Sequence, residues 1–382
     1  MKIAHVVDSM EVGGAEMLIL ALCRQHRREG HEVSVHCIME AGPLAETVAQ
    51  EGIPLRVYGS LPYWRLPWSL YCGLRAVRPD VVHCHNVVSS VFGAPVGRLA
   101  GARGVICTRH GVVANPHNLR RQGLFWLAAR FSDRVVAVCQ RGEQNLARAT
   151  FAVPQKLMTI RNGAEPAPGS RSGAEAIVKQ GFTAVMVARL AQPKDHATLL
   201  RSVAIASRSI LDLNLWVIGD GPKAPELQQL AARLGIEGRV RFLGERRDVG
   251  DWLARADLFV LSSQSEGVPI SLLEALAAGL PVLVTDVGGM PEIAQLSGVG
   301  RAVPPGDPNE MAAGILHFAG QRDRRAELAR LARQSYSQFF RPEQMASDYM
   351  GLYRSCLGQH SAAARTGNEP DQRERQGCHR AE

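Results

Sequence analysis

Short apolar segments recur along this chain, and a helical stretch separates each one from the next. Such alternation is typical of a parallel β-sheet with helices on both faces, because parallel strands need a crossover connection. The pattern stops between Asn162 and about Gln180, a segment rich in Gly, Pro, Ser and Ala, and then resumes. We therefore predict an α/β fold with two doubly wound, Rossmann-like domains facing a cleft. The expected strands are Ile3–Val7, Glu32–Cys37, Leu55–Tyr58, Val81–His85, Val105–His110, Arg134–Cys139, Phe182–Ala188, Leu215–Gly219, Val240–Leu243, Leu258–Leu261, Val282–Thr285 and Gly300–Val303.

The length of the chain allows two domains, because 382 residues with 46% hydrophobic content can supply two cores. We expect an N-terminal domain over 1–165, a linker over 166–180 and a C-terminal domain over 181–340. A helix over 341–358 is expected to pack back on the N-terminal domain. The tail, 359–382, has no apolar residues at a useful spacing, so it is predicted to be disordered.

The cysteine content and the hydropathy bear on the compartment. Eight cysteines without a C-x-x-C pair fit a reducing environment better than a disulfide framework. No run of eighteen apolar residues is present, and the first residues read as a strand, not as a signal peptide. The prediction is a cytoplasmic protein, either free in solution or peripheral on the inner face of the membrane.

The net charge of +8 is concentrated in the N-terminal half. Residues 1–165 hold 19 Lys and Arg against 12 Asp and Glu, whereas the remainder holds 25 against 24. A basic half favours an anionic partner, such as a membrane surface, a phosphate-bearing lipid or an acidic saccharide. No module that reads nucleic acid is recognisable, so a nucleic-acid partner is not expected. The aromatic and basic segments Leu61–Tyr71 and His117–Trp126 suit either a membrane interface or a hydrophobic core.

The segment from Glu266 to Pro281 is the strongest functional signal in the chain. Pro269 suits a first helical position and Gly279 a C-terminal cap, so a helix is predicted from Pro269 to Ala278. Glu274 lies inside this nearly all-apolar helix, and an unpaired buried carboxylate costs several kcal/mol. Glu274 must therefore meet a polar partner, either a loop or an Arg of the protein or a hydroxyl-rich ligand.

Other polar residues follow predicted strands, and ligands of open α/β sheets bind beyond the carboxyl ends of strands. Gly13-Gly14 opens a helix, and His110 stands at a strand end. Arg189 and Lys194, five residues apart, have the spacing of a diphosphate clamp. Each of these three features also has a non-functional interpretation. Gly13-Gly14 could be only a tight turn, His110 a surface imidazole without a role, and the Arg189–Lys194 segment a solvated charged turn. The turn Gly219-Asp220-Gly221 is equally open to both readings.

Metal and cofactor motifs are not found. His83 and His85 alternate with Cys84 along a predicted strand, and no second His/Cys pair lies at ligand spacing. No Asp-x-Asp follows a strand, no G-x-G-x-x-G is complete, and no nucleophile elbow is present. The sequence therefore predicts neither a metal nor a cofactor.

Together these motifs resemble those of the GT-B-fold retaining glycosyltransferases of family four (group 1 type), which include bacterial exopolysaccharide and lipopolysaccharide sugar transferases. The resemblance covers about residues 1–357 and is most specific at the two acids of the 266–281 segment. It implies a nucleotide-diphosphate sugar as donor substrate, with a UDP-sugar favoured, and a saccharide or lipid-linked acceptor on the N-terminal domain. It also implies catalytic roles for Glu266, His110, Arg189 and Lys194, and donor-binding roles for Gly13, Gly14, Gly219, Asp220, Leu243, Gly244, Gly267, Val268, Pro269, Ile270 and Glu274.

By the same resemblance, Glu266 contacts the donor sugar, Glu274 the ribose, and Arg189 with Lys194 the diphosphate. Transfer of a hexose-type sugar would be retaining and metal-independent, because cations and a helix dipole can stabilise the leaving diphosphate. One departure is Glu165, where relatives often carry an Asp after Asn-Gly and a hydrophobic residue. The alternatives are a sugar-nucleotide epimerase or phosphorylase of the same fold, or a non-catalytic nucleotide-sugar-binding protein.

Overall fold

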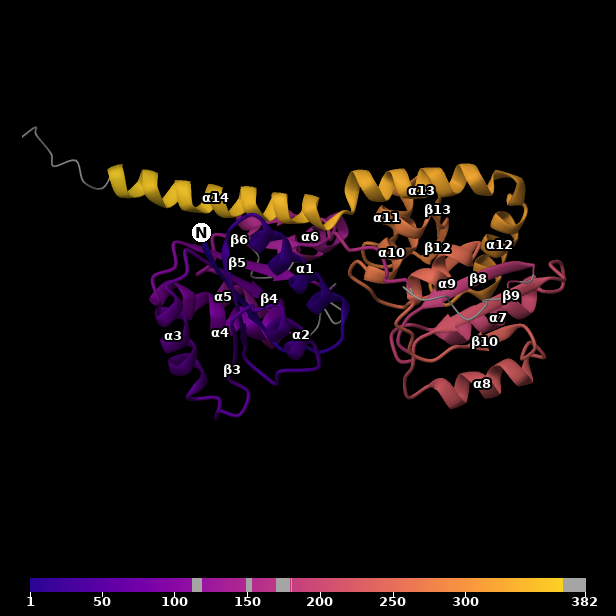
Figure 1. Ribbon diagram of the computed structural model, residues 1–382, viewed down its shortest axis with the longest axis horizontal. Helices are drawn as coiled ribbons and strands as arrows, with labels where there is room; N and C mark the ends of the chain where they lie inside the picture. Colours follow the sequence, from indigo (N-terminus) through magenta and orange to yellow (C-terminus); the bar gives the residue numbers. More distant parts are fainter. Residues whose placement is uncertain (112–118, 149–152, 170–178, 180, 367–382) are drawn as a thin grey trace, which may run out of the picture.

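Two α/β domains lie side by side in the computed structural model, which describes residues 1–111, 119–148, 153–169, 179 and 181–366 (Figure 1). The N-terminal domain has a seven-stranded sheet in the order β3-β2-β1-β4-β5-β6-β7, and the C-terminal domain has a six-stranded sheet in the order β10-β9-β8-β11-β12-β13. All strand pairs in both sheets are parallel. In each sheet the strand order reverses beside the first strand, as in doubly wound Rossmann-type sheets. The predicted fold class is confirmed.

The N-terminal domain places its most apolar strands at the centre of the sheet. The central strand β4 is buried along its whole length, as expected when helices cover both faces of a parallel sheet. The three-residue strand β7 was missed, because its side chains are only half-buried and carry little apolar pattern. The elements are β1 (Lys2–Val7), α1 (Gly14–Arg28), β2 (Glu32–Cys37), α2 (Leu44–Gln50), β3 (Leu55–Val57), α3 (Leu66–Val77), β4 (Val81–His85), α4 (Asn86–Leu99), β5 (Gly104–Arg109), α5 (Leu119–Ala129), β6 (Arg134–Ala137), α6 (Gln140–Ala147), a 3-10 turn (Pro154–Lys156) and β7 (Leu157–Thr159).

The C-terminal domain follows the predicted strands closely. The helix expected from Pro269 begins instead at Ile270, because Pro269 is extended and occupies the N-cap. Gly279 ends the helix in the left-handed conformation, as predicted. The elements are β8 (Phe182–Val187), α7 (His196–Ala206), β9 (Leu213–Ile218), α8 (Ala224–Arg233), β10 (Val240–Phe242), α9 (Val249–Arg255), β11 (Leu258–Leu261), α10 (Ile270–Ala278), β12 (Val282–Thr285), α11 (Met290–Ser297), β13 (Gly300–Val303), α12 (Pro308–Ala319), a 3-10 turn (Arg322–Arg324), α13 (Arg325–Phe339) and α14 (Pro342–Thr366).

The last helix, α14, returns to the N-terminal domain and lies along it (Figure 1). Tyr349 and Tyr353 of α14 are buried in one apolar cluster with Ile3 of β1 and Val81 of β4. The helix continues to Thr366, so it extends into the segment 359–382 that was predicted to be disordered. Residues 367–382 lie outside the described part of the chain. No helix within the described residues is both long and apolar enough to span a bilayer.

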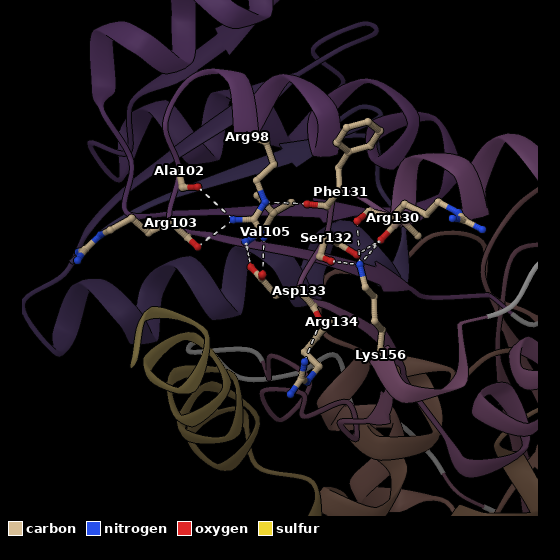
Figure 2. Close-up of polar contacts among 11 residues, drawn as sticks. Arg98, Ala102, Arg103, Val105, Arg130, Phe131, Ser132, Asp133, Arg134 and Lys156 are labelled. Carbon is tan, nitrogen blue, oxygen red and sulfur yellow. Dashed lines mark hydrogen bonds and ion pairs between the residues drawn. The ribbon is translucent and has the colours of Figure 1, made fainter. Parts of the chain in front are cut away.

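Two cations of the N-terminal domain bind backbone carbonyls between α5 and β6 (Figure 2). The ammonium of Lys156 donates to the carbonyls of Arg130 and Ser132 at 2.8 and 2.5 Å. The guanidinium of Arg98 donates to the carbonyl of Phe131 at 2.8 Å and pairs with Asp133. Part of the positive charge of this domain therefore stabilises the C-terminal end of α5, as cations do near helix C-termini.

The two aromatic segments of the N-terminal domain differ in exposure. Tyr63, Trp64 and Trp68 have 70, 74 and 69% of their surface exposed. Phe125 and Trp126 are 3 and 2% exposed and belong to the core under α4 and α5. Of the two interpretations of this segment, the core is therefore right for Phe125 and Trp126 and the membrane interface is wrong, because both rings fill the domain interior. His117 lies outside the described residues.

Candidate functional site

Glu266 and Lys194 meet beyond the carboxyl ends of β8 and β11. The ammonium of Lys194 pairs with Oε1 of Glu266, and the hydroxyl of Ser263 donates to the same oxygen at 2.8 Å. The Glu266 side chain is only 12% exposed and that of Lys194 22%, so the pair is shielded and fixed in orientation. Lys194 was predicted to contact a diphosphate, whereas its contact in this structure is Glu266.

Arg189 lies on the loop that connects β8 to α7. Its side chain is exposed and forms no ion pair with any residue in the described part of the chain. The loop itself is anchored, because Gln264 donates its N–H to the carbonyl of Pro193 at 2.8 Å and Ser262 donates its hydroxyl to the carbonyl of Asp195 at 2.9 Å. The loop therefore presents a cation in a defined place beside the Lys194–Glu266 pair.

Glu274 lies in the middle of α10 between Leu273 and Ala275, both fully buried. Burial raises the pKa of Glu274 from 4.5 to about 7. Over the residues that the structure describes, no side chain or backbone group donates a hydrogen bond to its carboxylate. The sequence left three partners open for Glu274, namely a loop, an Arg or a ligand. Within the described residues neither a loop nor an Arg binds its carboxylate.

Three glycines bring the remaining loops of the C-terminal domain together. The N–H of Gly219 donates to the carbonyl of Gly244 at 2.8 Å, which places Leu243-Gly244 beside the end of β9. Gly219 has a φ of +128°, and a Cβ there would meet the carbonyl of Ala188. Asp220 is exposed, and its carbonyl accepts the N–H of Leu190 at 2.9 Å. The Gly219–Gly221 turn therefore packs under the loop that carries Arg189.

The N-terminal ends of α1 and α10 face each other across the domain junction. A Cβ on Gly14, the first residue of α1, would lie 3.3 Å from Cγ1 of Ile270, the first residue of α10. Gly13 caps α1 without a side-chain hydrogen bond. Two helix N-termini from different domains thus converge, and each carries about half a positive charge.

No role was predicted for Glu16, although it follows Gly13-Gly14 at the same helix end. Its carboxylate folds back so closely that a Cβ on Gly13 would collide with it. Burial, together with the nearby Asp8 and Glu11, raises the pKa of Glu16. The N-terminus of α1 therefore already faces a carboxylate of its own chain. A Glu in the first turn before an apolar run was the available signal.

His110 follows β5 of the N-terminal domain and also contacts the C-terminal domain. Its carbonyl lies against Gly267, where a Cβ would collide with it. Nε2 of His110 lies 3.0 Å from Nδ1 of His85, and Nε2 of His85 lies 3.0 Å from Nδ1 of His5. Burial, and secondarily the charge of Arg109, lowers the pKa of His110 to about 4, so His110 is neutral at pH 7.

His83 shares a sheet face with His85, as the alternation predicted, and Cys84 faces the other side. The nitrogens of His83 contact the hydroxyls of Tyr353 and Thr108, both at 2.7 Å. His5, on the neighbouring strand β1, lies close to both His83 and His85 and was not predicted as their neighbour. Spacing within one segment cannot reveal a partner from a different strand.

The chain passes between the two domains twice, near Ala164 and near Phe340, and these two segments contact each other. Ala164 donates its N–H to the carbonyl of Phe340 at 3.0 Å, and the hydroxyl of Tyr336 donates to the carbonyl of Ala164 at 2.7 Å. Glu165, the departure from the family pattern, pairs with Arg24 of α1 at 3.0 Å. Glu165 therefore binds the N-terminal domain at the hinge.

Comparison with known proteins gives matches over both domains. A model described as Glycosyltransferase Family 4 matches residues 12–167, and one described as Glycosyl transferases group 1 matches residues 181–321. UDP-Gal:alpha-D-GlcNAc-diphosphoundecaprenol alpha-1,3-galactosyltransferase of Escherichia coli is 27% identical over 310 residues, which are 75% of this chain and 80% of that relative. N-acetyl-alpha-D-glucosaminyl L-malate synthase of Bacillus anthracis is 35% identical over 147 residues, but that match spans only 38% of this chain and 39% of the relative.

Among solved structures, Anabaena Alr3699/HepE in complex with UDP superposes with a TM-score of 0.82, at 23% identity, over 93% of this chain and 100% of that one. At this identity the likeness concerns the fold. Two Rossmann-like domains on this plan define the GT-B class of glycosyltransferases. The two family matches together reach across both domains, and the chain is a glycosyltransferase with an N-terminal domain of the family 4 type and a C-terminal domain of the group 1 type.

Proposed function

We propose that the enzyme is a retaining, metal-independent glycosyltransferase. It moves a hexose-type sugar from a nucleotide diphosphate, a UDP-sugar by preference, to a saccharide or lipid-linked acceptor in cell-surface polysaccharide biosynthesis. The UDP complex of the Anabaena neighbour and the name of the Escherichia coli relative support this donor and acceptor class. The observation that carries the proposal is Glu274, a buried carboxylate without a protein partner among the described residues.

The nucleotide half of the donor is assigned to the C-terminal domain. Ribose hydroxyls would donate to Glu274 and satisfy the carboxylate that burial leaves unpaired. Leu243-Gly244 lies beside the end of β9, where the base is proposed to bind. Arg189 supplies an exposed fork of donors for the diphosphate, and the facing N-termini of α1 and α10, with Gly13 and Gly14, add N–H groups.

The sugar is assigned to the space bordered by Glu266, His110 and the loop Gly267–Ile270. Glu266 is held by Lys194 and Ser263, so its second carboxylate oxygen is oriented to accept from sugar hydroxyls. Lys194, which pairs with Glu266, is proposed to lie beside the sugar and to contact the diphosphate when the donor binds. Val268 and Pro269 set the backbone that leads into α10.

The chemistry needs stabilisation of a leaving group, not a protein nucleophile. The bond between the anomeric carbon and the diphosphate oxygen breaks, and the acceptor oxygen bonds to the same face of that carbon. The proton of the acceptor hydroxyl passes to the departing phosphate. Arg189, Lys194 and the helix N-termini stabilise the negative charge that develops on the diphosphate.

A thermal-shift screen of the purified enzyme against UDP, GDP and ADP in EDTA tests the donor assignment. We expect one diphosphate, UDP by preference, to raise the Tm of the wild type and of Arg208→Ala, whose Arg is exposed beyond the end of α7. Arg189→Ala should show a much smaller shift. Absence of a shift with every diphosphate, or equal shifts in both variants, would contradict the donor site.

Product analysis separates this function from its alternatives. An epimerase would convert the sugar nucleotide without an acceptor, and a binding protein would convert nothing. A transferase releases the nucleoside diphosphate only with acceptor, and the anomeric proton coupling of the product reports retention. Inversion, or turnover that requires added divalent metal, would contradict the retaining, metal-independent mechanism.

The exposed aromatic segment of the N-terminal domain supports contact with an anionic membrane surface. Trp64 and Trp68 are about as exposed as any large apolar side chain of the described residues, and Arg65 lies over the Trp64 ring at 4.6 Å. We expect the enzyme to pellet with anionic liposomes at low salt, and Trp64→Ala with Trp68→Ala to reduce this. Leu211→Ala, at an exposed site of the other domain, serves as the control. Wild-type enzyme that stays in the supernatant would remove the membrane from the proposal.

A further inference from the structure

Three imidazoles form a line from the core of the N-terminal domain to the domain junction. His5 on β1, His85 at the end of β4 and His110 after β5 are joined by two N···N contacts of 3.0 Å. His5 and His85 are 0 and 1% exposed. The line ends at His5 Nε2 and His110 Nδ1, two buried nitrogens without a partner among the described residues.

The line has a direction because the three rings are neutral. Burial lowers the pKa of His5 to about 3 and of His110 to about 4, and it also lowers the pKa of His85 well below its usual value. A neutral imidazole has one N–H and one lone pair, and each N···N contact needs one of each. Both contacts must therefore point the same way, so the proton position on His110 is tied to that on His5.

The two possible directions differ in where they leave an unpartnered N–H. One places it on Nε2 of His5, inside the sheet. The other places it on Nδ1 of His110, a half-buried residue beside Gly267 at the domain junction. Both end nitrogens are buried, so either direction leaves one N–H without a partner. His5 is 0% exposed, whereas His110 is half-buried at the domain junction, where a ligand oxygen can supply the missing acceptor, so the second direction is favoured.

We propose that His85 and His5 are positioning residues that keep the proton of His110 on Nδ1, so that neutral His110 acts as a hydrogen-bond donor at the domain junction. The acceptor of this bond would be an oxygen of the donor sugar, and that part rests on the proposed function. Which ring nitrogen of His5, His85 and His110 carries the proton depends only on the folded protein, not on a bound donor.

A metal ion is a competing use of this cluster, since His5, His83 and His85 bring ligand nitrogens within 4.8 Å of one another. The hydrogen bonds argue against it. Both nitrogens of His83 contact hydroxyls at 2.7 Å, and Nδ1 of His5 contacts Nε2 of His85. An ion would have to replace several of these bonds by ligation in an already closed core.

The test is two-bond proton–nitrogen NMR of the full chain with nitrogen-15 in its histidine rings, at pH 7. We expect His5, His85 and His110 each to show the Nδ1–H tautomer. In His85→Leu, His110 should lose this single tautomer, and its Nδ1 signal should move towards the lone-pair region. In His85→Asn, an amide N–H can replace the Nδ1 donor, so the wild-type tautomer of His110 should return. His36→Leu removes another buried histidine, which bonds Tyr58, and should leave His110 unchanged.

An Nε2–H tautomer of His110 in the wild type would overturn the proposal, and so would an unchanged His110 in His85→Leu. Stoichiometric zinc in the purified enzyme would also overturn it. If His85→Leu does not fold, the wild-type tautomer still decides the question. Because no nucleotide is present, these results are independent of the donor screen, and failure of either idea can be told from failure of the other.

Discussion

Replacing Glu274 by Gln should make the free enzyme more stable and at the same time weaken its response to nucleotide. In the folded protein burial raises the pKa of this carboxyl from 4.5 to about 7. At pH 4 the group is protonated in both the folded and the unfolded chain, and it costs nothing. As the pH rises from about 4.5 to about 7, only the unfolded chain releases the proton, so the free energy of unfolding falls.

The size of this effect follows from the shift. One pKa unit corresponds to about 1.4 kcal/mol, so the full penalty above pH 7 is at most about 3.5 kcal/mol. A domain of this size responds to 1 kcal/mol with roughly 2–4 °C in Tm, which sets an upper limit of about 7–14 °C. Glu274→Gln should therefore melt higher than the wild type at pH 8, and most of that gain should disappear at pH 5.

The assay is a thermal melt of wild type, Glu274→Gln and Glu237→Gln at several pH values from 5 to 8, with and without UDP. Glu237 is exposed and serves as the matched control. We expect UDP to stabilise the wild type and the control, but Glu274→Gln only weakly, because an amide accepts from ribose hydroxyls less strongly than a carboxylate. A difference between Glu274→Gln and wild type that does not change with pH would refute the burial argument. An equal response of both to UDP would refute the ribose role.

Three further outcomes follow from the structure. Arg189→Ala should weaken UDP binding at least tenfold by calorimetry and change stability by less than about 0.5 kcal/mol, because Arg189 is exposed on an anchored loop; a loss of stability without a loss of binding would contradict this. Gly267→Ala should separate the domains, because its Cβ would collide with the carbonyl of His110, and faster proteolysis at the linker would report it. Trp126→Ala should cost about 3–5 kcal/mol in urea unfolding, whereas Trp64→Ala should cost less than about 0.5 kcal/mol; similar losses would contradict the core and surface assignments.

The strand pattern was predictable because parallel strands buried on both faces are short, apolar and bounded by turn residues. Strands such as Glu32–Cys37 and Val81–His85 have the bounds that the sequence predicted. The exception is Leu157–Thr159, a half-buried edge strand whose pattern is too short to stand out from a loop. The end of α14 at Thr366 was also missed, since its last turns lack the apolar spacing that signals packing.

The site was predictable where function depends on residues close in sequence. Glu266, Glu274 and Arg189 could be proposed as site residues because each lies on a loop or helix that follows a strand. His5 and Glu16 could not, because their significance depends on neighbours brought from other elements by the fold. The sequence also could not predict that Trp64 is exposed and Trp126 buried, because aromatic residues close to Arg occur both on protein surfaces and in cores.

The two acids of the 266–281 segment differ in their surroundings, and this difference supports the separate roles that the family resemblance implies for them. One oxygen of Glu266 is bound by the ammonium of Lys194 and the hydroxyl of Ser263, so the carboxylate is oriented before the donor binds. It can therefore accept hydrogen bonds from the sugar hydroxyls with little movement of its own side chain. Glu274 has no such support, and its ionised form becomes favourable only when a ligand supplies donors to it. Binding of the nucleotide should therefore release a penalty that the free enzyme carries, whereas contact of the sugar with Glu266 should not. On this argument the affinity for the donor depends on pH through Glu274, and it weakens as the pH falls below about 7 because the carboxyl must first lose its proton.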